Sequence, residues 1–198
     1  MPGYIESALE RLQHIVKISP QYSPHVHIPI QYGTKGTRQY ATSPDTSPLL
    51  NPKQTKYIQS ITGTFLYYGR ALDHTILPAL NEIASEQSSP TSTTMQKAKR
   101  LMDYIATYPT AYIRYHASQM ILNIDSDAAY LVAPKARSRV AGYYHLSCDP
   151  QLQPNPPLNG AIHIECKTLR HVVSSAAEAV VGGVFHNAQI AIPIRTLL

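Results

Sequence analysis

The amino-acid sequence predicts an α+β fold in which several helices come first and three antiparallel strands with one further helix follow. Apolar residues recur at helical spacing in the stretch between residues 4 and 107. Three strand-like segments come next, at residues 113–129, 135–147 and 159–169, and residues 174–191 have the character of a helix. With 198 residues, 43% of them hydrophobic, the chain is long enough for one domain or two small ones with a modest core.

The first predicted helix is short and amphipathic, and a proline-rich stretch follows it. The helix covers residues 4–16, and its apolar positions are Ile5, Leu9, Leu12 and Ile15 or Val16. Residues 19–53 are rich in proline, serine, threonine, tyrosine and glutamine and show no periodicity. Such a stretch cannot bury enough apolar area to offset its own ordering, so we expect an extended arm or linker held by something else, a partner subunit being one candidate.

Three more helices are predicted before the strands. The first covers residues 54–69, and its apolar stripe consists of Ile58, Ile61, Phe65, Tyr68 and Leu72. The second starts near Thr75 and ends near Glu86, because Pro78 is tolerated only in a first turn. The third covers residues 95–107, after a serine- and threonine-rich segment that supplies N-caps, and its inward residues are Ala98, Leu101, Met102 and Ile105.

Composition narrows the class of protein. No apolar run approaches the ~18 residues of a membrane span, and the N-terminus lacks the plan of a signal peptide. We therefore expect an intracellular protein, cytoplasmic or nuclear, with no membrane partner. Cys148 and Cys166 lack zinc-ligand spacing, which favours buried thiols. Seventeen Lys and Arg against twelve Asp and Glu give a net charge of +5, a basic bias compatible with a phosphate-backbone partner but not diagnostic of one.

Several sequence words, in their order along the chain, resemble a retrotransposon pol polyprotein of the copia-like type. The words are MPGYIESALERLQH at the N-terminus, then IQSITGTFLYYGRALD, MQKAKRLMDYIATYP and IRYHAS, and finally SDAAYL, PKARSRVAGYYHLS, NGAIH and SSAAEA. The resemblance implies the thumb and connection region of a reverse transcriptase followed by the first half of a ribonuclease H domain. The parts that it implies are an N-terminal helix (1–18), a Pro-rich arm (19–53), a helical connection-like subdomain (54–110) and a truncated ribonuclease H-like domain (111–198).

The resemblance places the first catalytic carboxylate of a ribonuclease H on Asp127. Asp125 shares a strand face with it, because side chains on a strand alternate between two faces. The family cleaves RNA in RNA–DNA hybrids with two Mg²⁺ ions, about 3.5–4 Å apart, which need several carboxylates. A lone Asp binds Mg²⁺ poorly, so Asp125 and Asp127 are weak metal candidates and we expect no bound cofactor.

The later carboxylates of the family are missing or have another explanation. The position aligned with the second one is Val180, and valine cannot hold a metal. Glu178 survives nearby, but Ser175 and Glu178 have the spacing of a capping box, in which each side chain accepts from the other's backbone N–H. The third and fourth carboxylates would lie beyond residue 198. We therefore expect Asp127 to be a remnant and the chain not to be an active nuclease, unless another chain supplies carboxylates.

Two groups of basic residues are candidates for phosphate contacts. One group alternates along the second strand segment, which places three charges on one face; it consists of Lys135, Arg137 and Arg139. The other lies in the helix of residues 95–107 and consists of Lys97, Lys99 and Arg100. The simpler alternatives are a strand protected by charge and the solvated face of an amphipathic helix.

No other chemistry is indicated. The histidines at 145, 163, 171 and 186 lie on different elements without helical pairing, so satisfied or solvent-facing rings are the better expectation. Ser174 and Ser175 lack a glycine-flanked nucleophile elbow, and no small-molecule substrate is evident.

Two hypotheses of function follow. In the first, the chain is an inactive remnant that still binds RNA–DNA hybrid or other nucleic acid through its basic residues. In the second, it is a structural or interaction protein, in which an open sheet edge and the Pro-rich arm pair with another copy or a partner.

Overall fold

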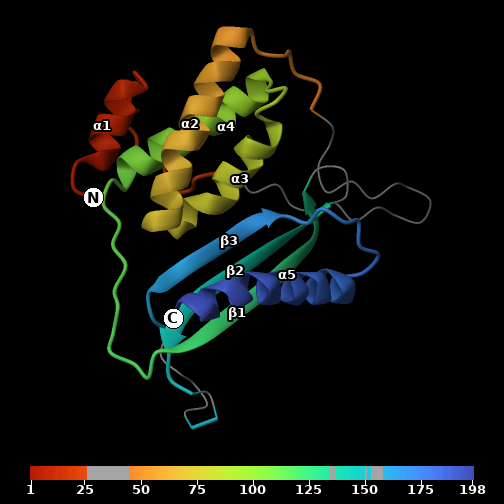
Figure 1. Ribbon diagram of the computed structural model, residues 1–198. Coiled ribbons are helices and arrows are strands. Elements are labelled where there is room, and N and C mark those ends of the chain that lie inside the picture. The colour runs from red at the N-terminus through yellow and green to blue at the C-terminus, as the bar shows by residue number, and fades with distance from the viewer. Residues whose placement is uncertain (26–44, 134–136, 150, 153–157) are drawn as a thin grey trace. The chain divides into compact units, whose positions relative to one another are not determined.

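The computed structural model describes residues 1–25, 45–133, 137–149, 151–152 and 158–198. These residues form two compact units (Figure 1). The helical unit contains the described residues up to Tyr112, and the sheet unit contains those from Ile113 to Leu198. The predicted α+β class, with helices before three antiparallel strands and a last helix, is confirmed. Lys135 and residues 26–44 of the predicted arm lie outside the described residues.

The helical unit packs its helices around one apolar core. The helices are α1 (Tyr4–Arg11), α2 (Pro52–Ala71), the 3₁₀ turn η1 (His74–Ile76), α3 (Leu77–Glu86) and α4 (Ser92–Thr107). The predicted stripe of α2 is confirmed for Ile58, Ile61, Phe65 and Tyr68, which are at most 1% exposed. Its last member, Leu72, follows the end of the helix and is half-buried. The predicted inward residues of α4 are buried as well. Burial of these apolar side chains, rather than helix propensity, stabilises such a unit.

Hydrogen-bonded caps move three helix ends away from their predicted positions. Asn51 and Gln54 form a capping box, so α2 begins at Pro52. Thr91 and Thr94 form another, so α4 begins at Ser92, three residues before the predicted start. Asp73, not Thr75, accepts a backbone hydrogen bond at the start of η1.

The first helix ends earlier than predicted. It stops at Arg11, and Gln13 has a φ of 52°, in the left-handed region, so the helical period does not continue. Ile15 and Val16 are consequently 90% and 47% exposed, and the prediction that one of them continues the buried face was wrong.

The arm is attached to the helical unit where it is described. Backbone hydrogen bonds of 2.9 Å join Leu50 N to Pro90 O and Ser92 N to Pro48 O. Asp45 accepts hydrogen bonds from the hydroxyls of Thr91 and Thr93. The N–H of Gln21 donates to the Thr107 hydroxyl at 3.0 Å. Both described ends of the arm are therefore held by this chain's own residues.

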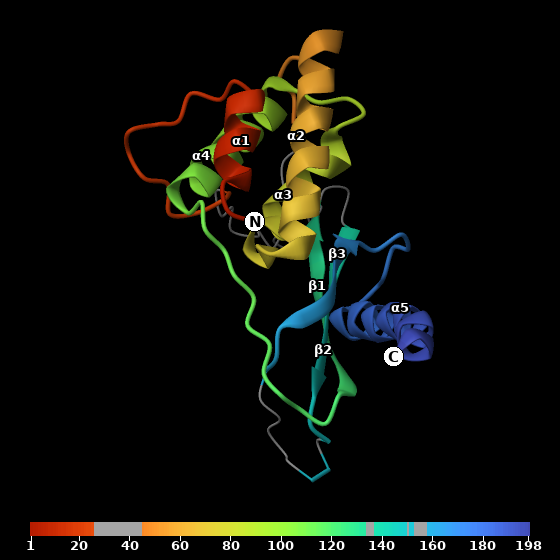
Figure 2. The same ribbon diagram turned by 60° about the vertical axis from the view of Figure 1, so that its left-hand side comes forward.

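The sheet unit is a three-stranded antiparallel sheet with one helix on one face. The strands are β1 (Ile121–Ala133), β2 (Arg137–Ser147) and β3 (Ala161–Thr168), in the order β1-β2-β3, and the helix is α5 (Ala176–Leu197). Figure 2 shows the helix along one side of the strands. The first strand starts at Ile121 rather than Ile113, and α5 extends six residues past the predicted end at Ala191. Residues 113–120 are instead held by Asn159, which bonds both backbone polar groups of His116.

A buried amide fixes α5 on the sheet. Asn187 is 1% exposed, and its Nδ2 donates to the Ser126 hydroxyl at 2.8 Å and to the Ala141 carbonyl oxygen at 2.9 Å. The Tyr144 hydroxyl donates to Asn187 Oδ1 at 3.0 Å. Gly142 makes room for this amide, since a Cβ there would lie 2.5 Å from Asn187 Oδ1.

Candidate nucleic-acid interface

Asp125 and Asp127 share one face of the sheet, as predicted. In the β1–β2 register they lie opposite Tyr143 and Ala141, whereas Ser126 lies on the face that contacts Asn187 of α5. Both carboxylates are on exposed residues. Asp127 Oδ1 accepts from the N–H of Ala128 at 2.8 Å, and neither carboxylate lies on the face covered by α5.

Glu178 caps the start of α5, with one change from the predicted pattern. The Ser175 hydroxyl accepts from the N–H of Glu178 at 3.1 Å, as expected. The Glu178 carboxylate, however, accepts from the N–H and the hydroxyl of Ser174, at 2.6 and 2.7 Å. The prediction that it accepts from the N–H of Ser175 was therefore wrong by one residue. These hydrogen bonds, the backbone one first, lower the pKa of Glu178.

The structure does not bring the aligned catalytic positions together. The side chain of Asp127 points away from α5, while Glu178 and Val180 belong to α5, on the other face of the sheet. Val180 is 43% exposed. Among the described residues, no group of three or more His, Cys, Asp or Glu side chains could hold a metal ion.

The basic strand residues lie on the same face as the acidic pair. Arg137 is exposed and Arg139 is half-buried, and Arg139 lies opposite Ala129 of β1. Because Asp125 and Asp127 occupy the same face, the two positive charges of its described residues are accompanied by two negative ones. The two carboxylates therefore weaken the attraction of Arg137 and Arg139 for a phosphate.

The predicted basic residues of α4 are separated by their contacts. Lys97 Nζ lies 2.8 Å from Glu82 and 2.7 Å from Glu86, so its charge is directed at α3. Burial alone would lower the pKa of Lys97, but the hydrogen bonds to the two carboxylates outweigh it and raise the pKa. Lys99 is exposed, and Arg100 is half-buried.

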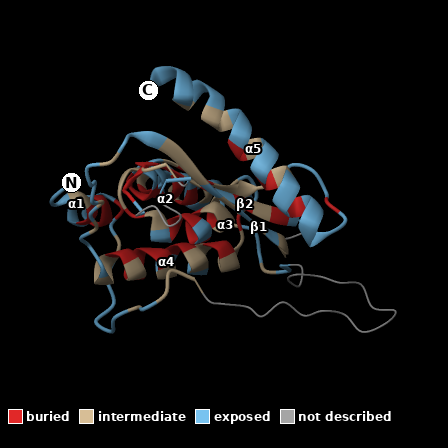
Figure 3. Cartoon of the chain, turned by 90° about the horizontal axis from the view of Figure 1, so that it is seen from below, coloured by how far each residue is buried: buried red, intermediate tan, exposed pale blue. Residues whose placement is uncertain are grey.

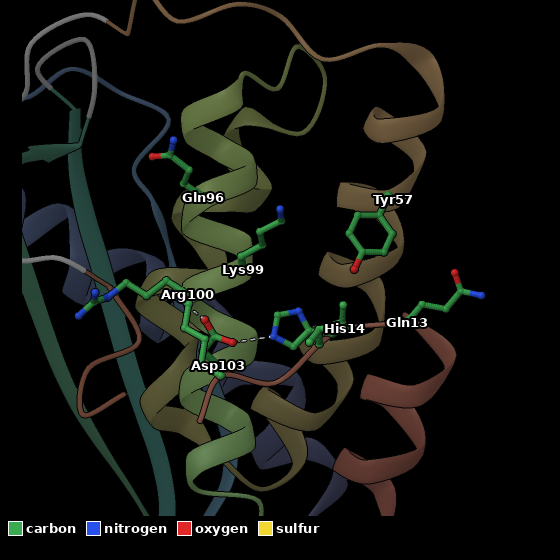
Figure 4. A pocket seen from close by; sticks show the side chains of 9 residues that line it. Gln13, His14, Tyr57, Gln96, Lys99, Arg100 and Asp103 are labelled. Atoms are coloured by element: carbon green, nitrogen blue, oxygen red, sulfur yellow. Dashed lines mark hydrogen bonds and ion pairs between the residues drawn. The ribbon is translucent and has the colours of Figure 1, made fainter. Parts of the chain in front are cut away.

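Lys99 and Arg100 line a cavity of about 370 Å³ in the helical unit, between α4, α2 and the segment after α1 (Figure 4). The ammonium group of Lys99 points towards the space beside Tyr57, and Arg100 extends away from Tyr57. The remaining lining residues are Gln13, His14, Ile15, Lys17, Gln96 and Asp103. The lining thus includes three formally cationic residues, Lys17, Lys99 and Arg100, and one carboxylate, Asp103.

The carboxylate of this cavity is already paired. Asp103 is 2% exposed, and its Oδ1 lies 2.8 Å from His14 Nε2. Lys17 Nζ lies 3.3 Å from Asp103 Oδ2. The Tyr57 hydroxyl donates to the carbonyl oxygen of Leu12 at 2.9 Å, which fixes the turn that carries His14. The cavity therefore holds a neutralised acid and further positive charge.

Sequence reasoning missed His14, Lys17 and Asp103. Asp103 follows Lys99 by four positions, a spacing that predicts an ion pair on the exposed surface of a helix. No local pattern indicates that its partner is His14, 89 positions earlier. The turn at Gln13, whose backbone is left-handed, places the His14 ring against Asp103 of α4.

Two of the histidines converge on one carboxylate in the sheet unit. Glu165 is 7% exposed, with His163 Nε2 at 3.2 Å and His186 Nε2 at 3.8 Å. Lys167 Nζ lies 3.4 Å from the same carboxylate. Different elements thus meet here, and the prediction of satisfied rings is confirmed for His163.

Comparison of the chain with protein-family models, with curated proteins and with solved structures finds no match. Among the described helices, none is both long and apolar enough to cross a membrane. Cys148 and Cys166 are free thiols.

Proposed function

We propose that this chain binds the phosphate backbone of nucleic acid without cleaving it, as a catalytically inactive remnant of a retroelement reverse transcriptase and ribonuclease H. The single observation that carries the proposal is the cavity of the helical unit, which Lys17, Lys99 and Arg100 line. The sequence resemblance suggests the class of ligand, RNA–DNA hybrid first. The cavity suggests where its phosphates bind.

The charge arrangement of the cavity supports a phosphate ligand. Asp103 is paired with His14 and Lys17, so it does not offset the charges of Lys99 and Arg100. The Nε of Arg100 is buried without a hydrogen-bond partner among the described residues. Guanidinium and ammonium groups both suit phosphate oxygens, which accept several such hydrogen bonds.

The sheet unit supports the absence of cleavage. Two-metal hydrolysis needs carboxylates that surround both ions at one place. Asp127 points away from the helix that carries Glu178 and Val180, so these positions do not share a site within the described unit. Asp127 then has no partner for the chemistry that the resemblance implies.

Fluorescence anisotropy with a labelled RNA–DNA hybrid tests the binding. We expect the double charge reversal Lys99→Glu with Arg100→Glu to weaken binding at least about tenfold at ~50 mM salt. It should also reduce the slope of log K against log salt by about 2, because two phosphate contacts are lost. The matched control is Lys53→Glu with Lys56→Glu, which makes the same charge change at exposed positions of α2 outside the cavity. Equal losses in both variants, or no binding at low salt, would refute the proposal.

A cleavage assay with Mg²⁺ on the same hybrid tests the second half of the proposal. We expect no product from the wild-type chain. Product that disappears in Asp127→Asn would show an active nuclease and overturn the assignment.

Self-assembly is the second candidate function. Among the described strands, β1 and β3 each pair on one side only, with β2. Such edges present unpaired backbone groups to another chain. Light scattering after size-exclusion chromatography tests it, and a monomer at ~100 µM would contradict it.

A further inference from the structure

Helix α5 exposes its apolar side chains and buries small and polar ones. The residues that it buries are Ala179, Gly183 and Asn187. Its exposed residues include Val181, Phe185 and Ile192, which are 67%, 65% and 67% exposed. Figure 3 shows the exposed colour along the outer side of this helix. No Asp, Glu, Lys or Arg occurs between Glu178 and Arg195.

The exposed residues form one stripe along the helix, which we call the outer stripe. It consists of Glu178, Val181, Phe185, Ala188, Ile192 and Arg195, all of them exposed. At 100° per residue, this stripe lies directly opposite the buried face centred on Gly183. The spacing alternates between three and four residues, which is the spacing of a helix–helix packing seam.

The outer stripe has the same spacing when it is read backwards. In an antiparallel pair of α5 helices, Val181 lies opposite Ile192 of the other copy, and the large Phe185 lies opposite the small Ala188. Glu178 lies opposite Arg195, so each end of the seam holds opposite charges. In a parallel pair, by contrast, like charges would meet at both ends. Charge and side-chain size therefore both favour the antiparallel arrangement.

The outer stripe is an apolar patch of the size at which function is common. Val180 and Val184, two further exposed apolar residues of α5, flank it on one side. Together with the stripe they expose on the order of 500 Å², in the upper part of the ~300–600 Å² that the largest apolar patch of a monomer usually covers, and such a patch is often functional.

We propose that the chain forms a two-fold symmetric dimer in which α5 pairs with α5 of a second copy in antiparallel orientation. The interface is isologous, so each of the three residue pairs occurs twice. The proposal uses neither the cavity of the helical unit nor the edges of the sheet. Its failure would leave nucleic-acid binding untouched.

Sedimentation equilibrium of the full chain tests the dimer. We expect a species of twice the chain mass of 21.9 kDa. Phe185→Glu, in the middle of the seam, should raise the dimer dissociation constant at least about 30-fold, as removal of a central anchor does. The matched control is Val172→Glu, at a residue 71% exposed before α5, which should leave the dimer intact. A wild-type monomer at ~100 µM would overturn the proposal, as would a dimer that survives Phe185→Glu, which would indicate pairing through the sheet edges.

Cysteine cross-linking tests the orientation. In a background with Cys148→Ser and Cys166→Ser, the double variant Val181→Cys with Ile192→Cys should form a disulfide-linked dimer under mild oxidation. Val181→Cys alone should not, because the two copies of this position are about 16 Å apart along an antiparallel seam, too far for a disulfide. A covalent dimer from Val181→Cys alone would indicate a parallel pair and overturn the orientation. Absence of a dimer in the double variant would overturn the seam itself, and would point to a different occupant of this face.

Anisotropy with the labelled hybrid should give the same affinity for Phe185→Glu and wild type, so the two proposals fail separately.

Discussion

The packing of Asn187 against Gly142 makes a double-mutant cycle that tests how α5 is held on the sheet. Asn187→Ala removes three side-chain hydrogen bonds, to Tyr144, Ser126 and the Ala141 carbonyl. At about 1 kcal/mol for each bond, this should cost about 2–3 kcal/mol, because the Tyr144 hydroxyl keeps the Asn187 backbone oxygen at 3.1 Å.

Gly142→Ala should cost a similar amount for a steric reason. The new Cβ would lie 2.5 Å from Asn187 Oδ1 and 2.9 Å from a ring carbon of Tyr144, distances at which something must move. Overpacking of this kind typically costs about 1–3 kcal/mol. In the double variant the methyl group added at position 142 occupies space that the amide has left. We therefore expect the double variant to lose about 3 kcal/mol of unfolding free energy, which is about 1–2 kcal/mol less than the sum of the two single losses.

Urea denaturation followed by circular dichroism measures the cycle, with a change in midpoint at unchanged slope as the criterion. Gln189→Ala, at an exposed position of the same helix, is the control and should change stability by less than about 0.5 kcal/mol. Additive costs in the double variant would refute the packing described here. So would a neutral Gly142→Ala.

Three further predictions concern the helical unit. His14→Ala should lower the unfolding free energy measured in urea by about 2 kcal/mol, since it leaves the buried carboxylate of Asp103 without its 2.8 Å partner. The control His171→Ala, at an exposed site, should leave the unfolding free energy unchanged. Lys97→Met should cost about 1 kcal/mol in thermal unfolding, because it leaves two partly buried carboxylates side by side, and no change would show that the pair contributes nothing. Hydrogen bonds from Thr91 and then Ser47 lower the pKa of Asp45 from 3.8 to about 2. The contribution of Asp45 to the attachment of the arm should therefore be complete above about pH 4 and be lost as pH falls through about 2. Carboxyl NMR titration checks this, with Ser47→Ala expected to raise the Asp45 pKa and an unchanged value counting against it.

The order and type of the elements could be predicted from the sequence because apolar spacing is a local signal. In α2 the stripe through Ile58, Ile61 and Phe65 identified the buried face without reference to any other segment. The exact ends of the helices were harder to predict, since they depend on side-chain hydrogen bonds such as those of Thr91 and Thr94. Gln13 ended α1 although the apolar period continued, so Ile15 was assigned to the wrong side.

The candidate site was predicted only in part, because it depends on contacts between distant positions. Lys99 and Arg100 were predicted as basic residues of a helix. No local sequence pattern distinguishes them from Lys97, which forms ion pairs with two glutamates of α3. His14 and Asp103 form a pair that only the folded chain brings together. Asn187 likewise has no local sequence signal and is buried because Gly142 leaves space for it.

The composition of α5 links the fold to the proposed assembly. A helix that covers one face of a sheet usually turns its apolar stripe inwards and a polar face to water. Here the inward side carries Ala179, Gly183 and Asn187, while Val181 and Phe185 face outwards. Small residues bring the helix backbone close to the sheet, and the buried amide sets its position along the strands. The larger apolar side chains are then left for a second surface, so a helix that is apolar on its outside is best explained as the middle layer between its own sheet and a partner.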